Sequence, residues 1–374
     1  MIHLLADENM VGLDRLPSSE LEIRTAAGRA ITRHDLEGID VLWVRSVTQV
    51  TEALVDKSEL RFVGTATAGL EHIDQTALTA RGIDFSAAPG ANANSVVEYV
   101  LSALVELEEP WERLEAGEAL GVVGYGAVGR LLVSVARTMG WKIRVYDPWL
   151  ADNGPDEPPE HWSSFADILD CAVISLHCSL RLEQPWPSFH LFDSQALASL
   201  HGSQWLVNAA RGPVVDRQAL RAHLEGSNPV NCVLDVWEGE PDFDSALLDL
   251  PALKIASAHI AGYSWDAKWQ ATRMLYQKLE EAGLVSGSIA PQSDTQTALD
   301  PVPGSGLNFA RALLAQRYNI RDDDRLFRKL GSLPPGEKAA AFDGLRRQYR
   351  QRRELRGASL SGSSVTLCDD NRRI

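Results

Sequence analysis

Residues 120–129 read LGVVGYGAVG, an apolar run that leads directly into three glycines, Gly124, Gly126 and Gly129. The apolar run predicts a buried strand, and the apolar side chains that recur at helical spacing over the next ten residues predict a helix. Glycines between a strand and a helix allow a tight turn and let the backbone approach a pyrophosphate, whose charge then lies at the helix N-terminus. The stretch therefore predicts a dinucleotide-binding loop.

Asp147 follows the next predicted strand, Ile143–Tyr146. A carboxylate at this place accepts hydrogen bonds from the adenosine ribose and repels a 2′-phosphate, so NAD is predicted in preference to NADP. The plainer alternative is that the glycines only make a turn and that Asp147 only caps the segment beginning at Pro148. Other dinucleotides also remain compatible with these residues.

Short apolar runs alternate with helix-like stretches on both sides of the glycine loop, which is the pattern of parallel sheets covered by helices. Two longer helices are expected, one opening after Asn94 or Ser95 and one over Trp265–Ala282. The other predicted strands are Ile2–Ala6, Val41–Arg45, Phe62–Thr65, Ala172–Leu176, Trp205–Asn208, Val230–Leu234 and Lys254–Ala256.

The pattern predicts an α/β protein with two doubly wound parallel-sheet domains, one Rossmann-like and one flavodoxin-like. Residues 1–95, completed by 263–285, form the first domain and residues 96–262 form the second. Gly, Ser, Pro and Thr crowd residues 286–306, which marks a linker. We expect residues 286–374 to form a small α+β C-terminal domain with a polar tail.

Composition excludes several classes of partner. The chain has 374 residues, of which 45% are hydrophobic, and 51 acidic residues against 36 basic ones give a net charge of -15. This charge argues against nucleic acid as the main partner. The start of the chain carries acids where a signal peptide has an apolar core, and no apolar run is long enough to span a membrane. We therefore expect a cytoplasmic protein, with no membrane partner and with its four cysteines reduced.

Three charged residues follow predicted strands downstream of the glycine loop: Arg211, Glu240 and His259. An imidazole titrates near neutral pH and can take the proton of a substrate hydroxyl. Glu240 would orient and stabilise the imidazole, and the planar guanidinium of Arg211 would hold a substrate carboxylate. Hydride transfer from a hydroxy acid to a nicotinamide requires this combination.

Each of these residues also has a structural alternative. His259 could be a satisfied structural histidine, Arg211 could pair with Asp216, and Glu240 could belong to a surface loop. Their order behind a nucleotide-binding pattern favours catalysis. The nine histidines are scattered without ligand spacing, so no metal site is predicted.

With these motifs the sequence resembles the D-isomer-specific 2-hydroxyacid dehydrogenase family, whose members carry Arg, Glu and His in this order in one nucleotide-binding domain. It is most similar to a branch of that family whose enzymes oxidise a small phosphorylated hydroxy acid. The motifs that carry the resemblance are ADENM (6–10), VRSVT (44–48), GTATAG (64–69), APGAN (88–92), VVEYV (96–100), RGPVVD (211–216), LDVWEGEP (234–241) and SAHIAGY (257–263).

The resemblance implies roles residue by residue. Arg211, Glu240 and His259 would be catalytic. Substrate would be bound by Ser46, Thr67 and Tyr263. Arg45 lies beside these hydroxyl-bearing residues as a candidate phosphate ligand, and it could equally be a structural ion-pair partner. Besides the three glycines, cofactor contacts would fall at Ala127, Val128, Asp147, Cys178, Ala209, Ala210, Arg211, Asp235 and Gly262. The family usually has Thr at the place of Cys178 and Cys at the place of Ala210, and both changes are compatible with contacts made by backbone atoms.

For residues 286–374 the resemblance implies dimerisation, and hence a homodimer. The segment Lys338–Leu355 predicts a helix dense in arginine, which could instead be a solvated face. A further hypothesis is that Arg346 and Arg350 reach the phosphate of a substrate bound by the partner chain.

Two alternatives to this function remain open. One is another 2-hydroxyacid dehydrogenase, acting for example on 3-phosphoglycerate or on an unphosphorylated acid. The other is a dinucleotide-sensing interaction protein on the same fold. Dependence of turnover on the substrate phosphate distinguishes the expected function from the first alternative. Absence of turnover would favour the second.

Overall fold

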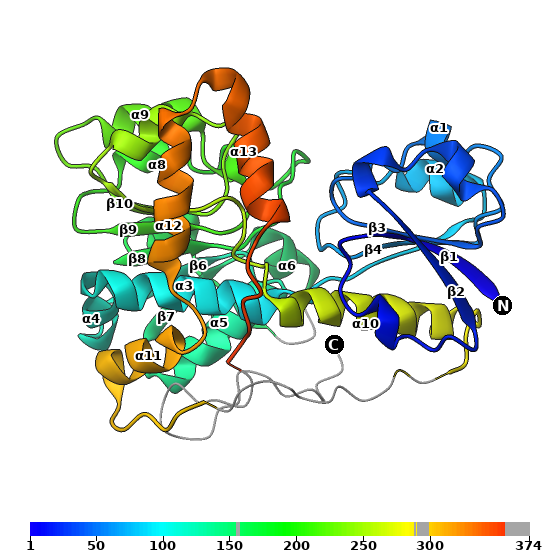
Figure 1. The fold of residues 1–374 in the computed structure, drawn as a ribbon. Coiled ribbons are helices and arrows are strands. Elements are labelled where there is room, and N and C mark those ends of the chain that lie inside the picture. Colours follow the sequence, from blue (N-terminus) through cyan, green and yellow to red (C-terminus); the bar gives the residue numbers. More distant parts are fainter. Residues whose placement is uncertain (155–157, 288, 290–298, 356–374) are drawn as a thin grey trace. The chain divides into compact units, whose positions relative to one another are not determined.

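The computed structural model describes residues 1–154, 158–287, 289 and 299–355. The chain divides into two compact units: unit 1 comprises residues 1–92 and 264–297, and unit 2 comprises residues 93–263 and 298–374. Each unit is built on a parallel sheet with helices on its faces (Figure 1). The two predicted doubly wound α/β domains are confirmed. Unit 2 includes the C-terminal segment, and the predicted domain boundaries with their roles stay predictions.

The sheet of unit 1 has the strand order β2-β1-β3-β4-β5. Its neighbouring residues point to opposite faces, as the period of a strand requires. Leu4 packs in a cluster with Leu275 of α10, whereas Leu5 packs in a second cluster with Leu54 and Leu78, from α1 and α2. The elements are β1 (Ile2–Asp7), β2 (Leu21–Ala26), β3 (Val41–Val44), α1 (Glu52–Val55), β4 (Phe62–Thr65), α2 (Gln75–Ala80), β5 (Asp84–Ala87) and α10 (Trp265–Glu281).

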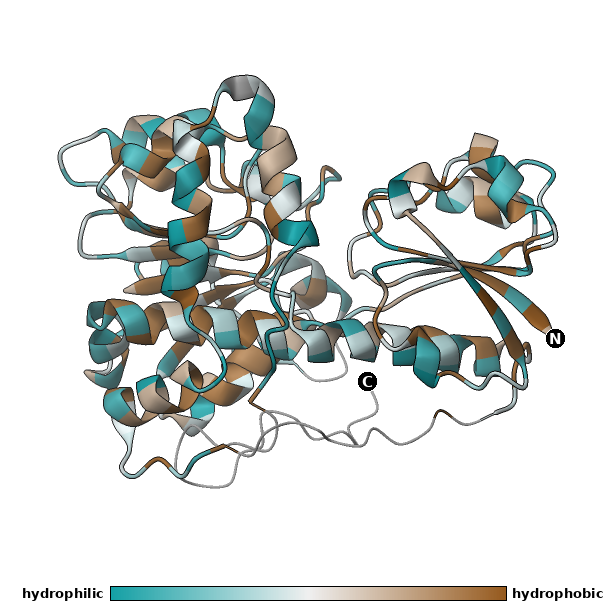
Figure 2. Cartoon of the chain, in the orientation of Figure 1, coloured by the Kyte–Doolittle hydropathy of each residue, from teal (hydrophilic) through white to brown (hydrophobic). Residues whose placement is uncertain are grey.

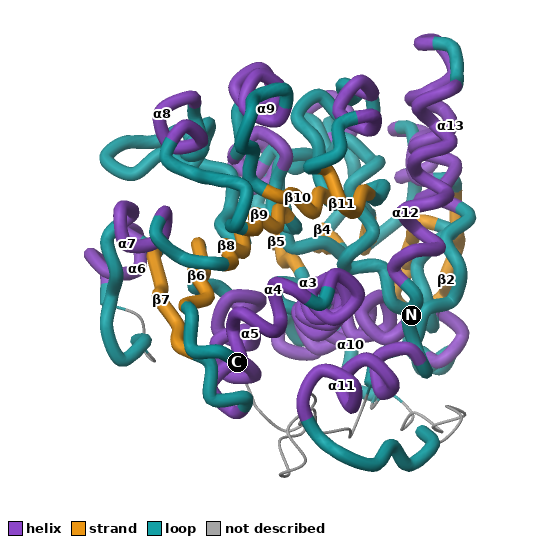
Figure 3. The backbone as a smooth tube through the Cα atoms, turned by 90° about the vertical axis from the view of Figure 1, so that its left-hand side faces the viewer, coloured by secondary structure: helices purple, strands orange, loops and turns teal. Residues whose placement is uncertain are grey.

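The sheet of unit 2 has the strand order β11-β10-β9-β8-β6-β7. Helices α8 and α9 lie over one face and α3 and α5 over the other (Figure 1, Figure 3). The strands are β6 (Ala119–Val123), β7 (Lys142–Tyr146), β8 (Val173–Leu176), β9 (Trp205–Asn208), β10 (Asn231–Leu234) and β11 (Leu253–Ala256). The helices up to β11 are α3 (Ala93–Leu107), α4 (Glu109–Glu115), α5 (Ala127–Thr138), α6 (Pro148–Asn153), α7 (Phe165–Leu169), α8 (Ser194–Ala198) and α9 (Arg217–Leu224).

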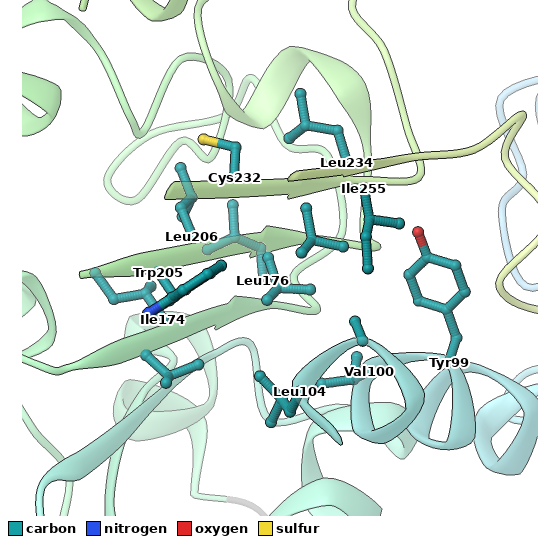
Figure 4. Close-up of a cluster of buried hydrophobic side chains, with 14 of the residues drawn as sticks. Tyr99, Val100, Leu104, Ile174, Leu176, Trp205, Leu206, Cys232, Leu234 and Ile255 are labelled. Carbon is teal, nitrogen blue, oxygen red and sulfur yellow. The ribbon is translucent and has the colours of Figure 1, made fainter. Parts of the chain in front are cut away.

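The core of unit 2 lies between α3 and the sheet. Figure 4 shows Val100 and Leu104 of α3 directed toward Leu176 and Leu206 of the strands, and all four side chains are completely buried. Burial of one such side chain stabilises the fold by about 1.5–3 kcal/mol. In Figure 2 the strands of this sheet are largely brown, which marks the continuous apolar runs expected of strands covered on both faces.

The described C-terminal residues of unit 2 form α11 (Gly306–Ala315), α12 (Ile320–Arg328) and α13 (Pro335–Arg347). Arg328 joins α12 to the sheet region, because its guanidinium donates to the carbonyl oxygens of Leu248 at 2.6 Å and Leu253 at 2.7 Å. Strands were expected here too, but residues 299–355 contain helices alone, and the predicted tail lies outside the described residues. The predicted helix to Leu355 ends earlier, at Arg347.

Short 3-10 helices complete the described elements: η1 (Leu13–Arg15), η2 (Gly28–Ala30), η3 (Arg33–Leu36), η4 (Gly212–Val214), η5 (Ser245–Asp249) and η6 (Lys329–Ser332). Within residues 1–154, 158–287, 289 and 299–355, none of the helices has the length and apolar character needed to cross a membrane.

Candidate active site

Glycine stands at the three positions between β6 and α5 for different structural reasons. Gly124 has φ 93°, and a Cβ placed there would lie 2.4 Å from the backbone nitrogen of Cys178. A Cβ at Gly129 would lie 2.0 Å from the carbonyl oxygen of Gly124. At Gly126, the N-cap of α5, a Cβ would meet no described atom within 4 Å. Gly124 and Gly129 are therefore needed to close the turn, whereas Gly126 leaves open space at the helix N-terminus, where a pyrophosphate fits.

Asp147 connects the end of β7 to the glycine loop. One carboxylate oxygen accepts the N–H of Tyr125 at 2.8 Å, and the other accepts the N–H of Leu150 at 3.1 Å as the N-cap of α6. Asp147 therefore caps α6 and also holds the glycine loop, and its contact with the cofactor stays a prediction. Since each carboxylate oxygen can accept more than one hydrogen bond, Asp147 keeps acceptor capacity for ribose hydroxyls.

A cavity of about 230 Å³ lies beside the glycine loop within unit 2. Two of its wall residues are uncharged at neutral pH, since burial raises the pKa of the Cys178 thiol to about 12 and lowers the pKa of His177 to about 3. Apart from the carboxylate of Asp147 and the guanidinium of Arg181 the wall is uncharged, which suits an adenosine. The lining residues of the cavity include Gly124, Gly126, Tyr146, Asp147, Trp149, His177, Cys178, Arg181 and Trp186.

The loop after β9 carries Arg211. Asn208 shapes this loop by accepting the N–H of Ala210 at 3.1 Å and donating to the carbonyl oxygen of Arg211 at 3.1 Å. A Cβ at Gly212 would lie 2.1 Å from the carbonyl carbon of Trp237. Glycine after Arg211 therefore lets this loop pack directly on the loop that carries Glu240.

His259 and Glu240 are brought together by the loops after β11 and β10. Nδ1 of His259 is hydrogen-bonded to Oε1 of Glu240, and both side chains are partly exposed, at 29% and 23%. Because a carboxylate accepts, Nδ1 carries the proton and Nε2 of the neutral ring is the basic nitrogen. The other Glu240 oxygen accepts the N–H of Trp237 at 3.0 Å. Burial by itself would raise the pKa of Glu240, but His259 and the Trp237 N–H outweigh it and the pKa is lowered.

Asp235 fixes the loop on which His259 stands. Its buried carboxylate accepts the hydroxyl of Ser257 at 2.6 Å and the N–H groups of Ile260 at 2.8 Å and Ala261 at 2.9 Å. Its carbonyl oxygen accepts the N–H of His259 at 2.7 Å, and His259 has φ 55°, which is unusual for a residue other than glycine. The cofactor contact expected of Asp235 stays a prediction, whereas its structural role is visible.

Tyr263 is four residues beyond His259 in the chain and contacts α13 and the residues that follow it. Its ring centroid is 6.0 Å from that of Tyr349 and 5.4 Å from the guanidinium carbon of Arg346. From the sequence, Arg346 was expected to reach a substrate bound by the partner chain. In the structure it lies in the same unit as Tyr263 and contacts its ring. The only local signal for this contact was the arginine-rich predicted helix, which does not show which of its arginines lies against Tyr263.

Comparison with known proteins identifies the family. Residues 107–261 match the D-isomer specific 2-hydroxyacid dehydrogenase, NAD binding domain. The chain is 41% identical over 372 residues to erythronate-4-phosphate dehydrogenase of Stutzerimonas stutzeri, covering 96% of this chain and 94% of that protein. It is 42% identical over 378 residues to the enzyme of the same name from Pseudomonas fluorescens, covering 97% and 96%. The chain belongs to the erythronate-4-phosphate dehydrogenase family.

Membership makes the chain an NAD-dependent dehydrogenase. Solved structures agree in fold: a glyoxylate reductase from Paecilomyes thermophila has a TM-score of 0.62 at 20% identity, covering 79% of this chain and 99% of that one. NAD-dependent formate dehydrogenase from Staphylococcus aureus in complex with NAD has a TM-score of 0.57 at 21% identity, covering 76% and 96%. Residues 307–370 of this erythronate-4-phosphate dehydrogenase homologue match a domain of unknown function.

The other substrate residues predicted for this erythronate-4-phosphate dehydrogenase family member belong to unit 1 and are described there alone. Ser46 is exposed, and the Thr67 hydroxyl donates to the carbonyl oxygen of Gly69 at 2.9 Å. Arg45 is 19% exposed and its guanidinium lies 3.8 Å from a carboxylate oxygen of Asp7, which is fully buried. The ion-pair alternative for Arg45 is thus observed, and its contact with substrate stays a prediction. In the described ranges no cluster of three or more His, Cys, Asp or Glu residues could hold a metal ion.

Proposed function

We propose that this chain oxidises 4-phospho-D-erythronate to (3R)-3-hydroxy-2-oxo-4-phosphooxybutanoate with NAD, in pyridoxine 5′-phosphate (vitamin B6) biosynthesis. The observation that carries the proposal is the pairing of His259 with Glu240, on loops that pack against the Arg211 loop. The substrate is taken from relatives 41% and 42% identical to the chain over nearly its whole length.

The proposed chemistry uses one group for each need of the reaction. NAD, when bound at the glycine loop, would supply the acceptor for the hydride that leaves C2 of the substrate. Nε2 of His259 takes the proton of the C2 hydroxyl, while Glu240 holds Nδ1–H and stabilises the imidazolium that forms. Arg211 holds the substrate carboxylate through paired N–H donors. Oxidation at C2 is then balanced, because one hydride and one proton leave the carbon and its oxygen.

The cofactor and substrate contacts remain part of the proposal. The open space at Gly126 and the acceptor capacity of Asp147 support NAD binding at the glycine loop. We propose further cofactor contacts at Ala127, Val128, Cys178, Ala209, Ala210, Arg211, Asp235 and Gly262. We propose substrate contacts at Arg45, Ser46, Thr67 and Tyr263.

We also propose that the protein is a cytoplasmic homodimer whose C-terminal segment, residues 286–374, forms the dimer contact. The support for the dimer is the resemblance of this segment to the branch of the family described above, and the support for the location is the expectation that the four cysteines are reduced.

The absorbance of reduced nicotinamide tests the function, because hydride transfer to NAD produces NADH. The substrates to compare are 4-phospho-D-erythronate, 3-phospho-D-glycerate and unphosphorylated D-erythronate, with a 2-oxo acid supplied in parallel to reoxidise bound cofactor. A strong preference for 4-phospho-D-erythronate is expected. Turnover of 3-phosphoglycerate alone would replace the substrate and keep the mechanism, and NAD binding without any turnover would favour a dinucleotide-sensing protein.

A further inference from the structure

The C-terminal helix α13 brings an arginine to the candidate active site of its own unit. Arg346 stands on the last turn of α13, next to its final residue, Arg347. Its guanidinium lies over the ring of Tyr263, and Tyr349 packs edge-on against the same ring. Tyr263 is four residues beyond His259, in the segment held by Asp235.

Arg346 is also coupled electrostatically to the catalytic pair. Burial disfavours the charged form of Arg346, yet its pKa is raised, because Tyr263 and the carboxylate of Glu240 outweigh burial. In turn the cation of Arg346 helps to lower the pKa of Glu240, after the larger effects of His259 and the Trp237 N–H. The guanidinium that lies over Tyr263 is therefore charged, and its charge acts on Glu240.

Arg346 also has a donor to spare. Among the described residues, the buried Nε–H of Arg346 has no hydrogen-bond partner. A buried N–H without a partner is destabilising, more so when the group is charged. A bound anion that accepted this N–H would remove the destabilisation, and it would explain why the donor has no partner within the protein.

The neighbouring arginines are engaged elsewhere. Arg350 donates to a carboxylate oxygen of Asp322 at 3.0 Å and to the carbonyl oxygen of Asn319 at 2.9 Å. Arg352 is buried and donates to the carbonyl oxygens of Ser95 and Ala261. These two residues anchor the segment after α13, and Arg347 is exposed. Of the two arginines that the sequence suggested for phosphate, the geometry favours Arg346.

We propose that Arg346 is a ligand of the substrate's phosphate and that the C-terminal segment supplies it to the active site of the same chain. This rests on the proposed function, since 4-phospho-D-erythronate carries a phosphate besides the carboxylate assigned to Arg211. A guanidinium whose Nε–H has no partner matches a phosphate dianion in charge and in planar geometry. The region that matches a domain of unknown function then has a part in substrate recognition, in addition to any part in assembly.

The test compares Arg346→Ala with Arg347→Ala, the adjacent exposed arginine, as the matched control. Loss of a charged hydrogen bond worth about 1.5–3 kcal/mol corresponds to about 10–100-fold in affinity. Arg346→Ala should raise the KM for 4-phospho-D-erythronate by about that factor and leave kcat/KM for unphosphorylated D-erythronate within about twofold of wild type. Arg346→Lys should recover part of the loss, and Arg347→Ala should resemble wild type.

A binding measurement keeps the test independent of turnover. Inorganic phosphate titrated calorimetrically into the NAD-loaded protein should bind about tenfold or more weakly to Arg346→Ala than to wild type. Equal loss of kcat on both acids, with phosphate binding unchanged, would show that Arg346 acts through Glu240 and would overturn the proposal. If wild type does not turn over 4-phospho-D-erythronate, the proposed function fails, and the phosphate titration still decides the role of Arg346. Thermal unfolding of each variant excludes loss of fold as the cause.

Discussion

Units 1 and 2 have the same strand order but different chemistry at the ends of their strands. The order β2-β1-β3-β4-β5 of unit 1 is repeated in unit 2 as β7-β6-β8-β9-β10, with β11 added at the edge. In unit 2 the first strand runs into Gly124 and an open helix N-terminus at Gly126. In unit 1 the first strand ends at Asp7, a carboxylate that is completely buried.

The difference explains why one sheet suits a dinucleotide and the other does not. The place where unit 2 offers glycine to a pyrophosphate holds a negative charge in unit 1. Asp7 accepts the N–H of Asn9 at 2.8 Å and pairs with Arg45, and Gly28 approaches it so closely that a Cβ there would lie 2.2 Å from its carboxylate. Topology thus predicts where ligands bind, and the residues at the strand ends decide which ligands.

The largest effect is expected at the strand ends of unit 2. His259→Gln should lower kcat for hydride transfer by about 10²–10⁴, the usual range for loss of a general base, and should leave NAD binding within about twofold of wild type. The control is His34→Gln, an exposed histidine of unit 1, which should retain wild-type kcat. A kcat for His259→Gln within tenfold of wild type would mean that another group takes the proton.

The sequence predicted most of what lies inside the two sheets. Strands covered on both faces, such as β4 and β9, are continuous apolar runs, and their predicted bounds match the observed ones. The strands β2 and β5 at the two edges of unit 1 were missed, because half-exposed residues interrupt the apolar pattern there. The helix α12 was missed because it is rich in charged residues.

The site was predicted in part for the same reason. Local sequence motifs identify Arg211, Glu240 and His259, because each of them follows a strand. They do not predict the hydrogen bond between the hydroxyls of Ser257 and Tyr99, which are 2.8 Å apart, because that contact joins segments 158 residues apart. Arg346 depends on the path of the chain after a linker, and no local pattern encodes that path.

Substitution of the glycines separates folding from cofactor binding. Gly129→Ala should lower the free energy of unfolding by about 1–3 kcal/mol, the usual cost of a side chain forced into a filled space, since its Cβ would lie 2.0 Å from a backbone oxygen. Gly126→Ala should keep wild-type stability and weaken NAD binding by about tenfold, because only the ligand needs that space. Urea unfolding and NAD titration measure the two effects.

Gly28→Ala is the counterpart in unit 1. Its Cβ would lie 2.2 Å from the Asp7 carboxylate, so stability should fall while NAD affinity stays unchanged. The comparison between the two sheets is contradicted if Gly28→Ala weakens NAD binding as much as Gly126→Ala does.

The two acids at corresponding places should differ in their effect on cofactor choice. Asp147→Asn removes the charge that repels a 2′-phosphate, so the preference for NAD over NADP should fall by about tenfold, or about 1.4 kcal/mol. Asp7→Asn should leave the preference unchanged and reduce stability instead, because it leaves Arg45 without its carboxylate partner. Kd values for both cofactors and unfolding curves decide between these outcomes. An unchanged NAD preference in Asp147→Asn would remove this carboxylate from cofactor selection.

The smallest effect is expected from Lys268 of α10, in unit 1. Burial and the nearby Arg45 lower its pKa from 10.5 to about 8. Between these two pH values the unfolded chain binds more protons than the folded one, so the stability contributed at this site rises with pH. Below pH 8 both states carry the proton, and the charged form is disfavoured in the folded state.

Lys268→Met should therefore be more stable than wild type at neutral pH, and the gain should shrink as the pH rises from about 8 toward 10.5. The matched control is Lys278→Met on the same helix, where the lysine is 45% exposed and pairs with Glu281. The measurement is the difference in the free energy of unfolding between each variant and wild type from pH 7 to pH 10, a range of about three units around the shifted pKa. A difference that stays constant over this range would show that Lys268 titrates as a solvated lysine. Neither burial nor the neighbouring Arg45 would then lower its pKa.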